Sequence, residues 1–116
     1  GEQIIDALVE EPFFQDCRNA LSPDGVFVTN WWSGDKRYQR FVERLLNVFE
    51  GRVLELPAES HGNMAVMAFQ SSPKEQNLDK LKKRAEKLSG QYGLDFKRML
   101  SDLKANNPNN GKHFYL

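Results

Sequence analysis

Hydrophobic positions along the chain follow two patterns, helical spacing and short unbroken runs. The clearest helical pattern covers residues 35–49, where apolar side chains recur at 38, 41, 42, 45, 46 and 49. Asp35 stands where such a helix would be capped. Weaker stripes predict helices at about 4–9 and 12–21, separated at Pro12, and two more at about 78–88 and 96–103, separated by Gly90 and Gly93.

Three short runs predict β-strands at Val26–Asn30, Arg52–Leu56 and Met64–Phe69. The first and third lack polar alternation, which predicts strands covered on both faces, as in a parallel sheet under helices. A helix joins the first strand to the second, so those two are predicted to be parallel and connected right-handedly. The loop before the third strand is too short for a parallel return, so that strand is predicted to be reversed.

The chain has 116 residues, which fits one small domain or a piece of a larger protein. Sixteen basic residues balance sixteen acidic ones, so no overall charge attracts nucleic acid or an anionic membrane. Cys17 is the only cysteine, and the two histidines, His61 and His113, lie far apart, so no metal site is expected. Neither a signal peptide nor an apolar run of membrane-spanning length stands out, which predicts a cytoplasmic protein with no membrane partner.

Charge is distributed unevenly. Residues 1–73 carry an excess of acidic residues, whereas residues 74–104 carry an excess of basic ones. The basic run Lys80–Lys87 contains Glu86 and follows Asp79 and Glu75, a mixture typical of a solvated helix face. Nucleic acid is therefore not an expected partner.

Two segments resemble a known family. Glu11–Phe14 followed by Leu21–Val28 resembles the "F-F … L-x-P-x-G-x-x-V" stretch of spermidine-synthase-like proteins, the polyamine aminopropyltransferases. Leu56–Met64 resembles the loop of the form "I-P-T-Y-x-x-G" that precedes the last strand of that family. The resemblance covers about residues 4–72, and the later helices resemble those of some bacterial members.

The resemblance implies the C-terminal portion of a Rossmann-like sheet of the class I methyltransferase fold. This α/β fold would hold two parallel strands plus one antiparallel strand, flanked by helices, with a C-terminal helical pair. Residues 1–72 would belong to the transferase domain, 73–105 would form a helical extension, and 106–116 a mobile tail. The family's Gly-rich cofactor loop lies earlier in its chain, so this sequence is expected to be part of a longer protein, without cofactor affinity or activity of its own.

The family transfers an aminopropyl group from decarboxylated S-adenosylmethionine to an amine such as putrescine. Asn30, Trp31 and Trp32 follow the first strand at its carboxyl end, where open α/β sheets bind ligands. The family has a glutamine near Asn30, and a tryptophan face can hold an alkylammonium. The alternative for Trp31 and Trp32 is that both belong to the core.

Glu59 and His61 lie in the loop after the second strand and are further candidates for the acceptor side. A carboxylate at Glu59 can pair with a cationic amine, and His61 can accept a proton near neutral pH. The family commonly has tyrosine where Glu59 stands. The alternative is that both are solvated loop residues.

Two other functions fit the same fold. One is a non-catalytic interaction module, in which the edge of the first strand pairs with another copy and makes a homo-oligomer. The other is part of an S-adenosylmethionine-dependent methyltransferase with a different acceptor.

Overall fold

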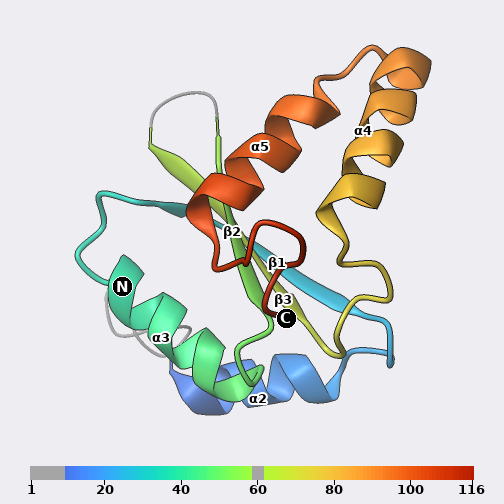
Figure 1. Ribbon diagram of the computed structural model, residues 1–116. Helices are drawn as coiled ribbons and strands as arrows, with labels where there is room; N and C mark the ends of the chain where they lie inside the picture. Colours follow the sequence, from blue (N-terminus) through green and yellow to red (C-terminus); the bar gives the residue numbers. More distant parts are fainter. Residues whose placement is uncertain (1–9, 59–61) are drawn as a thin grey trace.

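The computed structural model describes residues 10–58 and 62–116 (Figure 1). The predicted helix at 4–9 lies outside these residues. Every other predicted element is present, with shifted bounds, in the order α2 (Glu11–Asn19), β1 (Val26–Trp32), α3 (Tyr38–Val48), β2 (Val53–Pro57), β3 (Asn63–Phe69), α4 (Leu78–Tyr92) and α5 (Phe96–Asn106).

The three strands form one sheet in the order β1-β3-β2, and both pairings are antiparallel. The predicted reversal of the third strand is therefore confirmed. β1 and β2 run in the same direction, but they do not pair with each other, because β3 lies between them. The parallel arrangement predicted for Val26–Asn30 and Arg52–Leu56 is therefore not confirmed as a pairing. The short β2–β3 connection places β3 directly beside β2, and its other edge then takes up β1. Since β1 and β2 are both antiparallel to β3, their carboxyl ends lie at the same end of the sheet.

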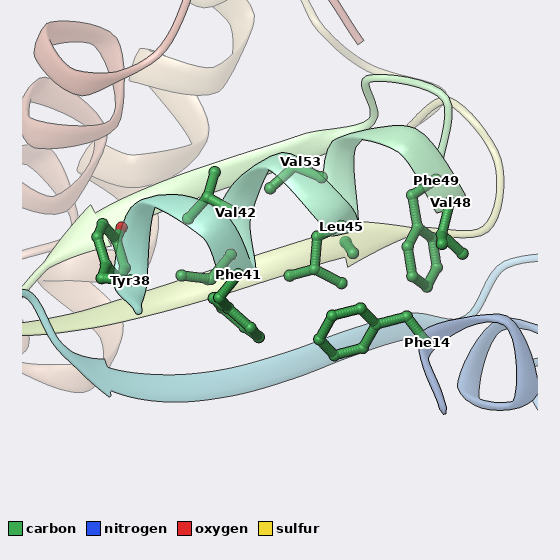
Figure 2. Close-up of a cluster of buried hydrophobic side chains, with 10 residues drawn as sticks. Phe14, Tyr38, Phe41, Val42, Leu45, Val48, Phe49 and Val53 are labelled. Atoms are coloured by element: carbon green, nitrogen blue, oxygen red, sulfur yellow. The ribbon is translucent and has the colours of Figure 1, made fainter. Parts of the chain in front are cut away.

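Helices cover the two faces of this sheet in two layers (Figure 1). On one face, α2 and α3 enclose the larger core, in which Leu45, Phe49 and Val66 are fully buried. Figure 2 shows the side chains of α3 pointing toward the strands, with Phe14 entering from α2. The periodic stripe of residues 35–49 is thus a buried helix face, as predicted.

The second core lies on the opposite face, beneath α4 and α5. Its buried members are Leu54, Leu78 and Phe114, and Met67 and Leu100 pack against them. The segment after α5, expected to be a mobile tail, is placed here against the sheet and α4. Phe114 is buried in the second core, and the Leu78 backbone N–H donates to the Lys112 carbonyl oxygen at 2.7 Å.

The helical elements begin and end close to their predicted bounds, with two differences. Gly90 does not interrupt α4, which continues to Tyr92 and ends at Gly93, whose φ of 69° suits glycine. Helix α3 begins at Tyr38, with Arg37 rather than Asp35 at its N-cap. The Asp35 carboxylate instead accepts a hydrogen bond from the Arg37 backbone N–H at 2.8 Å. Hydrogen bonds from Arg37 also hold the pKa of the Asp35 carboxyl below its usual value.

One face of β1 is open, contrary to the prediction that the strand is covered on both sides. Phe27 and Trp31 pack into the larger core, but Val26 and Val28 on the other face are 41% and 61% exposed. The reason is that the described residues of the second core lie over β2 and β3, and the core does not extend to β1. An apolar strand face without a covering layer is characteristic of a surface that meets another unit.

Tyr38 links α3 to the sheet through its hydroxyl, which donates a hydrogen bond to the Glu55 carboxylate. Burial, and then the hydrogen bond to Glu55, raise the pKa of Tyr38 above its usual value. A raised pKa in the folded state means that the neutral phenol stabilises the fold below about pH 10, and that this stability declines as the pH rises further.

Tyr38→Phe should therefore lower the free energy of unfolding at pH 7 by about 1–2 kcal/mol, the contribution of one buried hydrogen bond. It should also remove the part of the alkaline loss of stability that Tyr38 causes. Urea unfolding between pH 7 and pH 10.5 measures both effects. Tyr92→Phe is the matched control, since Tyr92 is 62% exposed. Identical pH profiles for the two variants would contradict the assignment.

Candidate functional site

A cleft of about 730 Å³ opens at the end of the sheet where β1 and β2 terminate. Its floor is one row across the three strands, because Asn30 lies opposite Ala65 and Ala65 lies opposite Leu56. Directly opposed residues project from the same face of a sheet. Ala65, the central residue, carries only a methyl group, so the row is low between its larger neighbours. The remaining sheet residues of the cleft are Val28, Thr29, Pro57 and Ala58.

The wall opposite Asn30 comes from the C-terminal helices. The turn before α5 and its first turns contribute Leu94, Asp95, Arg98 and Met99. The sequence pattern does not predict these residues as part of the site. Asp95 carries a local signal as a helix-capping residue before Phe96, but only the packing of α5 on the sheet brings it near Asn30.

Two charged side chains lie on this wall. The Asp95 carboxylate is exposed and accepts a hydrogen bond from the Arg98 backbone N–H at 3.0 Å, which caps α5. The Arg98 guanidinium forms an ion pair with Asp102 at 3.1 Å, one helical turn further on. The cleft therefore combines an amide, a carboxylate and a guanidinium with a largely apolar lining. Such a mixture suits a ligand with an aliphatic chain and polar ends.

The structure separates the two tryptophans. Trp31 lies on the core side, with its ring 4.6 Å from the Phe41 ring and 5.9 Å from the Arg37 guanidinium carbon. Trp32 lies on the same face of β1 as Asn30 and is 60% exposed. The sequence pattern is compatible with either placement, in the core or in the site, for each of the two residues.

The loop after β1 and the loop between β2 and β3 meet at this end of the sheet. The Ser33 backbone N–H and hydroxyl both donate to the Gly62 carbonyl oxygen, at 2.8 and 2.7 Å. The Trp32 indole lies against Gly34, where a Cβ atom would come within 2.5 Å of the ring. The β2–β3 loop is thereby attached next to Trp32. Glu59 and His61, predicted for the acceptor side, belong to that loop but lie outside the described residues.

No α-helix in the described ranges is both long and apolar enough to cross a lipid bilayer. No family model matches the chain, and no solved structure matches it.

Curated relatives, by contrast, match over all 116 residues. Two proteins of Neisseria meningitidis, from serogroups A and B, are each 87% identical to the chain. A protein of Chromobacterium violaceum is 60% identical. All three are named polyamine aminopropyltransferase, and the chain spans 44% of the length of each. The chain therefore belongs to the polyamine aminopropyltransferase family and corresponds to the C-terminal part of its longer relatives.

Proposed function

We propose that this chain forms the amine-acceptor side of an enzyme that transfers an aminopropyl group from decarboxylated S-adenosylmethionine to a diamine. The observation that carries the proposal is the cleft with Asn30 in its floor, in a chain 87% identical to proteins named for this activity. The nucleoside co-substrate is assigned to the part of the enzyme that this chain does not span.

The chemistry required of this side is to bind and orient the attacking amine. A neutral amine nitrogen attacks the carbon next to the sulfonium of the co-substrate. The carbon–nitrogen bond forms as the carbon–sulfur bond breaks. The thioether leaves with the bonding pair, and the new ammonium releases a proton to a base or to water. Holding the nitrogen in line with that carbon supplies much of the acceleration.

The residues of the cleft fit a diamine at both ends. The Asn30 amide oxygen can accept a hydrogen bond from an N–H group of the reacting amine, which leaves the lone pair of the amine nitrogen free for attack. The exposed carboxylate of Asp95 can pair with the distant ammonium. The apolar surface of Leu56, Ala65 and Met99 would contact the methylene chain between them. Trp32, on the same face, offers its ring to a cationic group at the entrance.

The open face of β1 supports a second part of the proposal, that this sheet is the end of a larger Rossmann-like sheet. Val26 would then be covered by the rest of the enzyme, while Val28 would lie at the side of the cleft. The outer edge of β1 is also the surface through which a second copy could pair, which keeps the homo-oligomer as the alternative.

Product analysis with the full-length protein tests the function. The protein is offered decarboxylated S-adenosylmethionine or S-adenosylmethionine, each with a panel of linear diamines, and the products are identified by mass spectrometry. We expect aminopropylated diamine and the matching thioether, formed only with the decarboxylated co-substrate. The isolated 116-residue chain, as the control, should form no product. Methylated amine from S-adenosylmethionine would refute aminopropyl transfer in favour of the methyltransferase alternative.

A further inference from the structure

Asn107 stands out in the part of the chain that the structure describes, because it is the one polar residue there that is buried, at 7% exposure. It follows the last residue of α5 and faces the outer edge of β2. Burial of a polar side chain is costly unless its hydrogen-bonding groups are satisfied. The partners of Asn107 therefore indicate what the residue does.

The Asn107 side-chain amide forms hydrogen bonds with both backbone groups of one residue of β2, Glu55. Its Oδ1 accepts a hydrogen bond from the Glu55 backbone N–H at 2.7 Å, and its Nδ2 donates to the Glu55 carbonyl oxygen at 2.8 Å. A neighbouring strand would make the same pair of bonds, so the side chain takes the place of a fourth strand at this edge. Nδ2 also donates to the Leu103 carbonyl oxygen at 2.8 Å, which satisfies the end of α5.

These three bonds fix where α5 lies along β2. The other end of α5 is tied to α4, since the Phe96 backbone N–H donates to the Ser89 hydroxyl at 3.1 Å. That bond joins the two C-terminal helices to each other and does not involve the sheet. Leu100 and Leu103 pack in the second core, but hydrophobic contact is not directional and so does not by itself fix the orientation of α5. The two hydrogen bonds between Asn107 and Glu55, by contrast, connect the end of α5 directly to the sheet.

The cleft depends on this attachment from both sides. Glu55 directly precedes Leu56, one end of the floor row, and α5 carries the wall with Arg98 and Met99. Asp95 lies about 18 Å along the helix from Asn107 at 1.5 Å per residue. A small rotation of α5 at Asn107 is therefore magnified at Asp95, on the wall that faces Asn30.

We propose that Asn107 is a positioning residue that sets the width of the acceptor cleft, and with it the length of diamine that the enzyme prefers. The inference rests on the proposed function, in which this cleft binds the acceptor. Asn107 does not line the cleft, and its effect passes through α5.

The test uses the full-length enzyme with Asn107→Ala and Asn107→Asp. The alanine variant leaves room for water on the Glu55 peptide groups and is the one expected to fold well. The aspartate variant keeps the shape but loses both N–H donors. Asn106→Ala is the matched control, because Asn106 is exposed and its side chain donates a hydrogen bond within α5, to the Asp102 carbonyl oxygen at 2.7 Å.

The main readout is the ratio of kcat/KM for two diamines that differ by one methylene group. A ratio does not change when part of the enzyme is merely unfolded, so it separates positioning from stability. Wild-type discrimination of one methylene is typically about 10-fold or more, and we expect both Asn107 variants to lose most of it. The KM for the nucleoside co-substrate should stay unchanged, as should the ratio in Asn106→Ala.

Hydrogen exchange at residues 94–99 provides a readout independent of activity. It should be faster in Asn107→Ala than in Asn106→Ala. If the wild type transfers to diamines but the ratio and the exchange are unchanged in the Asn107 variants, the inference is overturned and the function stands. If the wild type forms no aminopropylated product, the function fails, and the inference fails with it as a statement about diamines. Unchanged exchange would in that case also exclude Asn107 as the anchor of α5.

Discussion

Phe14→Ala is expected to lower the free energy of unfolding by about 3–5 kcal/mol, the usual cost of removing a phenylalanine ring from a packed core. Phe14 is 1% exposed. Its ring centroid lies 5.4 Å from that of Phe41 on α3 and 6.3 Å from that of Phe27 on β1. Phe14 thus packs α2 against both the sheet and α3, and the cavity left behind would border three elements.

Phe13→Ala is the control for this experiment. Phe13 precedes Phe14 in α2 but is only partly buried at the rim of the same core, so its loss should cost clearly less. Urea unfolding of the full-length protein, followed by tryptophan fluorescence, measures both. A cost below about 1 kcal/mol for Phe14→Ala, or an equal cost for both variants, would mean that the core is not packed as described.

Asn30→Ala is expected to lower kcat/KM for the amine acceptor by about 10- to 100-fold, the loss of one hydrogen bond to a polar or charged ligand group. Asn30 lies in the cleft floor, opposite Ala65 and facing the wall that carries Asp95. The loss should appear with the amine varied and the nucleoside co-substrate saturating. Stability should hardly change, because Asn30 is exposed.

Asn63→Ala is the matched control, since Asn63 is an exposed asparagine at the same end of the sheet that does not line the cleft. Its kinetic constants should equal those of the wild type. Equal losses in both variants would point to a general disturbance of the sheet edge. An unchanged kcat/KM in Asn30→Ala would remove Asn30 from the acceptor site.

Local patterns predicted the elements well where one physical signal dominated. The apolar stripe from Tyr38 to Phe49 predicts a buried helix face, and the unbroken run at Met64–Phe69 predicts a covered strand. β3 is indeed the central strand, with Val66 and Ala68 fully buried. The same reasoning misjudged β1, whose apolar run is as continuous, because nothing in Val26 or Val28 reveals whether another layer lies above them.

Pairing order and the second wall of the cleft depend on contacts between distant segments. The short loop after β2 correctly predicts the direction of β3, but a loop length does not say on which side of β2 the strand will lie. Likewise, the local sequence identifies Asp95 only as a helix cap and Met99 only as a member of an apolar helix stripe. They reach Asn30 only through the attachment of α5 to β2, which depends on Asn107, a residue in a segment expected to be mobile.

The central position of β3 has a consequence for synthesis on the ribosome. While the chain emerges, β1 and β2 have no partner in this sheet until β3 has left the exit tunnel, since each of them pairs only with β3. The nascent protein therefore carries β1 without this partner while the residues between Trp32 and Phe69 are translated, and β2 without it while the residues between Pro57 and Phe69 are translated. During that interval these strands are open to premature association with neighbouring nascent chains, and holdase chaperones would have their greatest effect there.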